Sequence, residues 1–325
     1  MPNIAFFDNR WVGKNGIGRY SHEIGTRLDS ERIIFITGGI PTRLNEIFPI
    51  YRNLDYTNLL YSPGYIALPR FKRQIITIHD LILLKPSIGS KLHRLYFNFY
   101  LKPKIRNGSI KVVTVSESSR IELAEWAQIS TKEILIIPNG LSDALLSAGK
   151  NLLRQKRGRC LIYVGNDKPH KNFDLLADAT WYLKDEWRII VVGSVLSKRE
   201  ISNRHKVEYY SDISDEKLAS LYLESDLLVT TSLFEGFCMP VLEGAYLGCK
   251  VVHLGVLPTI YEIIGDNSFS THGSTSPKAL AKKMMQAHES SSRISESTRK
   301  ALAARFDWDQ SARIVQQILL ESISN

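Results

Sequence analysis

The sequence is poor in cysteine and has no long apolar run. Its three cysteines, Cys160, Cys238 and Cys249, do not have the spacing of metal ligands, and such sparse use predicts a reduced, cytosolic compartment. No stretch approaches the ~20 apolar residues that span a bilayer, and the chain begins with a strand-like run rather than a signal peptide. We therefore expect a cytoplasmic protein without a membrane-spanning helix.

No internal repeat stands out either. The 325 residues suffice for two domains, at about 150 residues each. A hydrophobic content of 44% and a charged content of 23% are typical of a soluble globular protein. Strand-like runs alternate with helical patterns, and the alternation restarts at residues 160–165. The pattern predicts an α/β protein with two parallel sheets.

Acidic residues are nearly missing between residues 65 and 112. Asp80 is the one acid there, against ten basic side chains, so this segment carries the whole formal net charge of +9. The basic residues are Arg70, Lys72, Arg73, Lys85, Lys91, Arg94, Lys102, Lys104, Arg106 and Lys111. Such a patch is typical of a surface that binds an anionic partner.

Residues 90–106 within this segment predict a helix that is both aromatic and basic. Its apolar side is expected to hold Leu92, Leu95, Tyr96, Phe99 and Tyr100. An anionic membrane surface fits this combination. Two alternatives stay open: an ordinary solvated helix with core aromatics, and a nucleic-acid surface, although no recognised nucleic-acid-binding motif accompanies the charge.

The stretch 230–252 is the most informative part of the chain. It joins the strand-like runs 226–231 and 250–254 through a loop with Gly236 and a short amphipathic helix that Pro240 is expected to open. A strand, a loop and a helix in this order are ordinary α/β construction. In open α/β sheets, however, ligands bind outside the carboxyl ends of the strands.

Two carboxylates flank the start of this short helix. Glu235 lies in the loop and Glu243 at the end of the first helical turn, while Phe237, Cys238 and Met239 offer backbone N–H groups near the helix N-terminus. A glutamate in a first turn is also favoured by the helix dipole alone. Carboxylates accept hydrogen bonds from sugar hydroxyls and backbone N–H groups hold phosphates, so a nucleotide-sugar or phosphosugar site is a reasonable interpretation.

Two features of the first half also point to a site at strand ends. Gly16 and Gly18 follow the first strand, residues 3–8, but their spacing is not the G-x-G-x-x-G of a dinucleotide site. His79 ends the strand 74–79. By itself, a strand-end histidine bonded to backbone is the simpler interpretation.

The segment FEGFCMPVLEGAYLGCKVV, residues 234–252, resembles the E-x7-E signature of the retaining family-4 glycosyltransferases, the glycosyl transferases group 1. The resemblance extends to GIGRY at 16–20 and PNG at 138–140. It implies a GT-B fold, in which two Rossmann-like, doubly wound domains face each other across a cleft. The implied acceptor domain is 1–148 with a returning helix 307–325, followed by a linker 149–159 and a donor domain 160–306.

The same resemblance implies roles for individual residues. Glu235 and the 237–239 backbone would position the hexose, and Glu243 would accept the ribose hydroxyls. Lys171, supported by Lys168, would neutralise the diphosphate. The other implied contacts are the loops of Gly16, Gly18 and Gly165 at the donor, His79 at the transferred sugar, and Glu262 closing the donor pocket.

Three positions depart from the family pattern. Asn166 replaces an arginine that holds the diphosphate, so Lys168 or His170 would have to supply the missing charge. Cys238 replaces a glycine, where its side chain would crowd the donor sugar, and Gly244 replaces an alanine.

The resemblance implies retaining transfer of a hexose, with GDP-mannose favoured over UDP-hexoses as donor. We expect a saccharide acceptor that is polyprenyl- or lipid-linked, in bacterial surface polysaccharide or lipopolysaccharide synthesis at the inner face of the cytoplasmic membrane. The resemblance implies that no metal or cofactor is needed. Asp307 and Asp309 form a D-x-D pair, but they precede a helix, where such residues are typically caps. The alternatives are a GT-B nucleotide-sugar epimerase and a basic nucleic-acid-binding protein; a nicotinamide oxidoreductase lacks its fingerprint.

Overall fold

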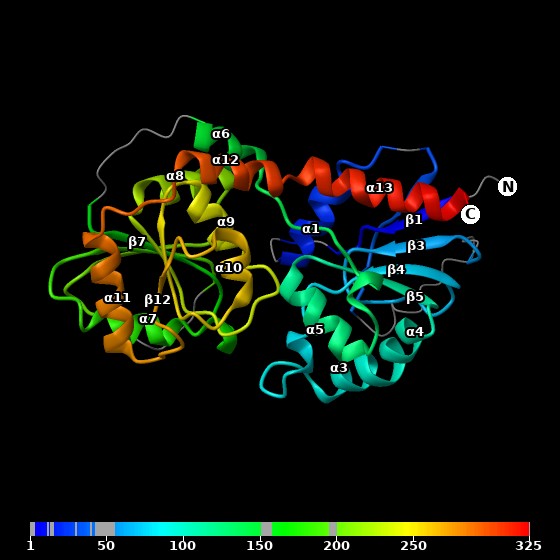
Figure 1. The fold of residues 1–325 in the computed structure, drawn as a ribbon, viewed down its shortest axis with the longest axis horizontal. Coiled ribbons are helices and arrows are strands. Elements are labelled where there is room, and N and C mark those ends of the chain that lie inside the picture. The colour runs from blue at the N-terminus through cyan, green and yellow to red at the C-terminus, as the bar shows by residue number, and fades with distance from the viewer. Residues whose placement is uncertain are drawn as a thin grey trace. The chain divides into compact units, whose positions relative to one another are not determined.

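The chain divides into two compact units, shown in Figure 1. The computed structural model describes residues 4–11, 13, 16–29, 31–39, 41–42, 56–150, 158–194 and 200–324. Unit 1 is Met1–Gly140 with Phe306–Asn325, and unit 2 is Leu141–Arg305. Most of the expected linker 149–159 lies outside the described residues.

Unit 1 ends at Gly140, earlier than the expected boundary at residue 148. The difference arises because helix α6 (Asp143–Lys150) packs within unit 2. Leu145 of α6 is fully buried, and the Tyr246 hydroxyl of unit 2 donates a hydrogen bond of 3.1 Å to the Leu146 carbonyl oxygen. Residues 141–148 therefore add to the core of the second unit.

Unit 1 contains a parallel sheet of six strands with the order β2-β1-β3-β4-β5-β6. Strands buried on both faces are typical of parallel sheets covered by helices, and β1 and β3 are buried throughout. The strand order reverses between β1 and β3: β2 lies on one side of β1, and β3 to β6 follow on the other. The carboxyl ends of β1 and β3 therefore form a topological switch point. The strands are β1 (Ala5–Asp8), β2 (Ile33–Ile36), β3 (Leu59–Ser62), β4 (Arg73–Thr77), β5 (Ile110–Thr114) and β6 (Leu135–Ile136), with helices α1 (Gly16–Gly25) and α5 (Glu117–Ala127).

The predicted helix 90–106 forms as three consecutive pieces. They are α3 (Lys91–Leu95), a π turn η2 (Tyr96–Leu101) and α4 (Lys102–Arg106). Ser90 begins the helix with a capping box. Pro103 has no N–H and its ring clashes with the carbonyl four residues earlier, which accounts for the widened turn.

One face of this helix packs into unit 1. Phe97, Leu101 and Ile105 are buried, and their four-residue spacing places them on that face. Three residues of the expected apolar side are exposed: Leu92 by 58%, Leu95 by 44% and Phe99 by 77%. The helix therefore shows an apolar surface to solvent among its basic side chains.

The last helix, α13 (Trp308–Ser324), belongs to unit 1, although it follows unit 2 in the chain. The fully buried Trp308 ring packs edge-to-face against Tyr20 of α1, with ring centroids 5.9 Å apart. Asp307 caps the helix by accepting a hydrogen bond of 2.7 Å from the Asp309 N–H, and Arg27 binds Asp309. Of the helices that the structure describes, none is both long and apolar enough to cross a bilayer.

Unit 2 contains a second parallel six-stranded sheet, with the order β12-β11-β10-β7-β8-β9. Its strands are β7 (Cys160–Val164), β8 (Arg188–Val192), β9 (Lys206–Tyr210), β10 (Leu227–Thr230), β11 (Lys250–His253) and β12 (Phe269–Ser270). Its helices include α7 (Phe173–Thr180), α8 (Asp215–Glu224), α9 (Met239–Tyr246), α10 (Pro258–Ile264), α11 (Pro277–Glu289) and α12 (Glu296–Arg305). The strand order reverses between β7 and β10.

Ion pairs hold the amino ends of these strands. Asp226, just before β10, is 1% exposed and accepts hydrogen bonds from Arg293 at 2.7 Å and from His288 at 2.8 Å. The buried Lys250 ammonium lies 3.5 Å from the same carboxylate. Burial lowers the pKa of Lys250.

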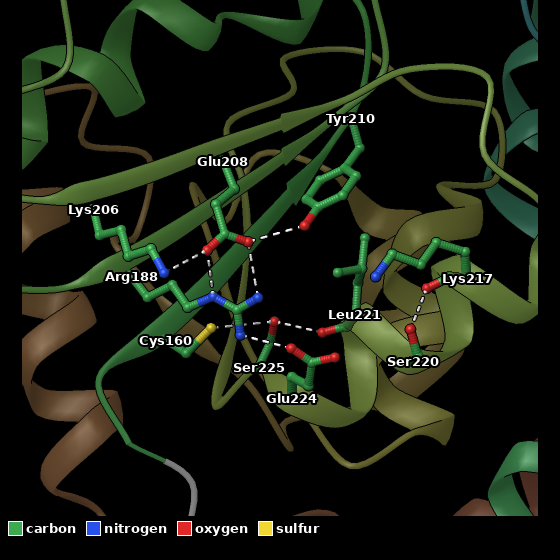
Figure 2. A network of polar contacts seen from close by, with 10 residues as sticks. All are labelled: Cys160, Arg188, Lys206, Glu208, Tyr210, Lys217, Ser220, Leu221, Glu224 and Ser225. Atoms are coloured by element: carbon green, nitrogen blue, oxygen red, sulfur yellow. Dashed lines mark hydrogen bonds and ion pairs between the residues drawn. The ribbon is translucent and has the colours of Figure 1, made fainter.

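Figure 2 shows a second network, centred on Arg188 at the start of β8. Its guanidinium forms two hydrogen bonds with Glu208 of β9 and one of 2.6 Å with Glu224 at the end of α8. The hydrogen bonds from Arg188 lower the pKa of Glu208 to about 2. Both networks lie at the amino edge of the sheet, which leaves the carboxyl edge for a ligand site.

Candidate functional site

The loops that follow β7 and β10 are joined to each other at the switch point of the unit 2 sheet. The Leu233 N–H donates to the His170 carbonyl oxygen at 2.8 Å, and the Thr231 hydroxyl donates to the Lys171 carbonyl oxygen at 2.8 Å. These bonds fix residues far apart in sequence at the place where doubly wound sheets bind ligands.

Lys171 and Glu235 form an ion pair across these two loops. The Lys171 Nζ lies 2.5 Å from Glu235 Oε1. The two side chains are 16% and 14% exposed, so both charged groups are largely shielded yet remain accessible. The structure thus brings together two of the predicted catalytic residues, one from each side of the switch point.

The turn between Glu235 and α9 is built around Cys238, which has a left-handed φ of 64° and caps the helix. This conformation favours glycine, so a cysteine here carries backbone strain. Helix α9 begins at Met239, so Pro240 is its second residue rather than its first. Cys238 is 3% exposed, and burial raises the pKa of its thiol to about 12, which keeps the thiol neutral.

Glu243 lies in α9 and is 3% exposed. Its Oε2 accepts a hydrogen bond of 2.9 Å from the Tyr222 hydroxyl of α8. Phe237 is tied to α10, because its carbonyl oxygen accepts a hydrogen bond of 3.0 Å from the Thr259 hydroxyl. Glu262 of α10, by contrast, lies 3.7 Å from the Arg305 guanidinium of α12.

The loop after β7 supplies a second cation. The Lys168 side chain is exposed and forms no ion pair within the described part of the chain, while its N–H donates to the Asn166 side chain at 3.2 Å. His170 is 8% exposed, and burial followed by the Lys171 charge lowers its pKa, so it stays neutral. Of the two candidates to replace the missing arginine charge, only Lys168 carries one.

Glycines allow the close approaches that these loops require. A Cβ on Gly165 would lie 2.8 Å from the Tyr163 hydroxyl, so only a small residue fits beside β7. In unit 1, a Cβ on Gly18 would lie 2.3 Å from the Gly13 carbonyl oxygen, whereas one on Gly16 would meet open space. Gly18 is therefore needed to shape the turn before α1.

His79 follows β4 at the carboxyl edge of the unit 1 sheet. Its Nε2 donates a hydrogen bond of 3.0 Å to the Pro63 carbonyl oxygen, and its ring packs edge-to-face on Tyr20, with centroids 5.0 Å apart. Burial lowers the pKa of His79 to about 4. The backbone bond that the simpler interpretation predicts is present, and it leaves Nδ1 of a neutral imidazole as a hydrogen-bond acceptor.

Sequence reasoning missed a buried ion pair in unit 1. Arg10 donates to both carboxylate oxygens of Asp8, at 2.7 and 2.9 Å, and the two residues are 2% and 0% exposed. Asp8 ends β1, so the pair lies at the switch point of the first sheet. A D-x-R sequence directly after a buried strand was the signal available for it.

Replacing His253 by asparagine is expected to flatten the acid side of the stability profile. His253 is fully buried at the end of β11, its Nδ1 accepts from the Gly255 N–H and its Nε2 contacts Ser268, and burial lowers its pKa to about 4. The unfolded histidine takes up a proton near pH 6.5, so stability falls as the pH falls from 6.5 to 4, by about 3 kcal/mol. Urea denaturation across this window measures it.

The exposed His272 provides the matched control for this experiment, and His272→Asn should retain most of the slope. Asparagine keeps an acceptor near the position of Nδ1, so the Gly255 hydrogen bond is conserved. An unchanged slope in His253→Asn would contradict the assignment of a neutral buried imidazole.

Comparison with known proteins finds a family model that matches part of the chain and relatives of low identity. Residues 149–305, just under half of the chain, match the family model described as glycosyl transferases group 1. The O-antigen chain mannosyltransferase RfbU of Salmonella typhimurium is 23% identical over 268 residues, which are 79% of this chain and 72% of the relative. The O-antigen chain mannosyltransferase B of Escherichia coli is 24% identical over 242 residues, 65% of this chain but only 61% of the relative.

A solved structure extends the likeness to both units. HepE of Anabaena, crystallised with UDP and glucose, superposes with a TM-score of 0.71 at 19% identity. The match covers 98% of this chain and 99% of HepE. At this identity the likeness shows the fold, which is the two-sheet GT-B architecture.

Proposed function

Taking as premise that this chain is a glycosyltransferase whose residues 149–305 form a glycosyl transferases group 1 domain, we propose that it transfers a hexose from a nucleoside diphosphate sugar to a saccharide acceptor with retention. Mannose from GDP-mannose is the proposed donor group, because the two relatives compared are named mannosyltransferases. UDP-hexoses are the second candidates.

The observation that carries the proposal is the Lys171–Glu235 pair at the switch point, with Glu243 on the adjoining helix. Lys171 would stabilise the charge that develops on the departing diphosphate, and such preorganised electrostatic stabilisation is usually the largest catalytic contribution. Lys168 would add charge to the same diphosphate. Glu243 would accept the ribose hydroxyls, and Glu235 the hydroxyls of the hexose.

The proposed reaction breaks the bond between the anomeric carbon and the diphosphate oxygen and forms a bond from the anomeric carbon to the acceptor oxygen. The acceptor's proton passes to the departing phosphate oxygen. Glu235 is therefore not assigned the nucleophile's role that a glycosidase carboxylate has, and its pairing with Lys171 suits a positioning role. No metal or cofactor is included in the proposal.

A lipid-linked acceptor is the second part of the proposal. The exposed Leu92, Leu95 and Phe99 share the 91–106 helix with five of the ten basic residues of the 65–112 segment, which is the composition of an interfacial helix. We propose that this helix rests on an anionic membrane from the cytoplasmic side. The names of the relatives, O-antigen chain mannosyltransferases, are consistent with synthesis of a surface polysaccharide.

Nucleotide binding tests the proposed donor site. Thermal unfolding is measured with GDP-mannose, UDP-glucose and dTDP-glucose at 100 times Kd, where one ligand adds about 2.7 kcal/mol, or roughly 5–10 °C for a domain of this size. The Glu243→Ala variant is expected to lose this shift. Glu216→Ala, which removes an exposed carboxylate from α8, should keep it.

Two results would count against a transferase. Turnover of the donor without any acceptor would support the GT-B epimerase instead. Binding of DNA with a steep salt dependence, and no shift with any nucleotide sugar, would support a nucleic-acid-binding protein.

A further inference from the structure

Tyr222 connects the helix before β10 to the carboxylate of Glu243. Its side chain is fully buried on α8, and its hydroxyl donates a hydrogen bond of 2.9 Å to Glu243 Oε2. Burial and the adjacent Glu243 charge raise the pKa of Tyr222 well above its usual value, so the hydroxyl stays protonated. It therefore acts only as a donor toward this carboxylate.

Both the backbone and the ring of Tyr222 have close neighbours. The Cys249 thiol donates to the Tyr222 carbonyl oxygen at 3.2 Å. Gly244 lies beside the ring, where a Cβ would come within 3.3 Å of the Tyr222 ring and 2.8 Å of the Leu228 side chain. A glycine immediately after Glu243 thus provides the space that the ring occupies.

We propose that Tyr222 is the positioning residue for Glu243, an inference that rests on the proposed role of Glu243 as the acceptor for ribose hydroxyls. A buried carboxylate without a donor is costly and free to rotate, whereas one bonded to a fixed hydroxyl is held in a single orientation. The ligand then meets an acceptor that needs no reorganisation, and such preorganisation favours affinity.

This position has a specific kinetic consequence. The ribose takes no part in bond making or breaking, so its contacts bind the ground state and the transition state equally. Loss of the Tyr222 hydroxyl should raise the donor KM and leave kcat nearly unchanged. A general weakening of the fold would not separate the two constants in this way.

The experiment compares Tyr222→Phe with Tyr246→Phe by titration with GDP and with UDP. Tyr246 is also a buried tyrosine and lies on α9, but its hydroxyl binds the Leu146 carbonyl oxygen rather than a carboxylate. We expect Tyr222→Phe to weaken binding of the accepted nucleotide about tenfold, in line with the loss of one hydrogen bond to a charged group. Tyr246→Phe should bind as the wild type does.

A double-mutant cycle with Glu243→Ala shows whether Tyr222 acts through Glu243. Tyr222→Phe should have no further effect on nucleotide affinity in the Glu243→Ala background. The same tenfold loss in both backgrounds would overturn the inference. If Tyr222→Phe does not fold, Gly244→Ala crowds the same ring, and its effect on affinity should also vanish in the Glu243→Ala background.

Failure of this inference is distinguishable from failure of the proposed function. If Glu243→Ala weakens nucleotide binding but Tyr222→Phe does not, the positioning role alone is wrong. If Glu243→Ala binds GDP and UDP as the wild type does, or the wild type binds neither, the assigned ribose site is wrong and the inference falls with it.

Discussion

Replacing Lys171 by methionine is expected to lower kcat for hexose transfer by about 10²–10³-fold. That is the usual cost of removing one preorganised group that stabilises charge developing in a transition state. Lys171 is well placed for it, because its side chain is only 16% exposed at the switch point and its attraction for a phosphate is only partly screened by water. Initial rates of nucleoside diphosphate release, with and without acceptor, measure the loss.

Two lysines of the same unit serve as comparisons for Lys171→Met. Lys168→Met should mainly raise the donor KM, by about tenfold. The Lys168 side chain is exposed, so its proposed contact with the diphosphate contributes to donor binding more than to the chemical step. Lys217→Met removes a lysine of α8 whose Nζ lies 5.3 Å from the centroid of the Tyr210 ring, and it should leave transfer unchanged. An unaltered kcat in Lys171→Met would contradict its assignment to the diphosphate.

The structure of each Lys171 variant must be checked as well, because Glu235 loses its partner. An uncompensated carboxylate that is 14% exposed destabilises its surroundings. The double variant Lys171→Met/Glu235→Gln removes both charges. If it recovers stability but not kcat, a disturbed loop does not account for the loss of rate. Glu235→Gln alone then measures the share that belongs to the hexose contact.

Introducing glutamate at Leu92, Leu95 and Phe99 together is expected to abolish binding to anionic vesicles. Burying one such side chain contributes about 1.5–3 kcal/mol, and each basic residue near an anionic surface adds about 1 kcal/mol. The triple change removes the apolar contacts and introduces three repelled charges, so the partition coefficient should fall by more than about 10³-fold. Flotation with vesicles containing phosphatidylglycerol, at low salt, measures this.

The control for flotation uses exposed apolar residues elsewhere in unit 1. Ile121 and Leu135 are 53% and 46% exposed, outside the basic segment, and Ile121→Glu/Leu135→Glu should float like the wild type. Wild-type binding should weaken as salt shortens the screening length from about 30 Å at 0.01 M to about 10 Å at 0.1 M. No flotation of the wild type at low salt would remove the proposed membrane contact.

The prediction of a glycosyltransferase with a GT-B fold is confirmed. It depended on the alternation of strands and helices and on the resemblance of residues 234–252 to the family signature. Buried strands alternating with helices predict parallel sheets, and residues at the carboxyl ends of neighbouring strands meet once the sheet forms. Lys171 and Glu235, 64 positions apart, were named from the resemblance, and the ends of β7 and β10 bring them together. Retention, the donor sugar and the lipid-linked acceptor stay predictions.

Other features depend on geometry that residue spacing does not reveal. In the 91–106 helix the sequence grouped Leu92, Leu95 and Phe99 on an apolar side. Packing decides which side meets the core, and that side holds Phe97 and Leu101. The hydrogen bond from Tyr222 to Glu243 joins two helices that belong to separate β/α units. Tertiary packing decides such a pairing between residues 21 positions apart.

Helix α13 gives the protein an unusual order of completion during synthesis. Unit 1 is assembled from residues before and after unit 2, and Trp308 of α13 covers Tyr20 of α1. A ribosome that adds ~5–20 residues per second needs on the order of ten seconds to add residues 141–305 before α13 emerges. The unit that is encoded second can therefore finish folding first, while the nascent first unit still exposes the apolar surface that its last helix will cover.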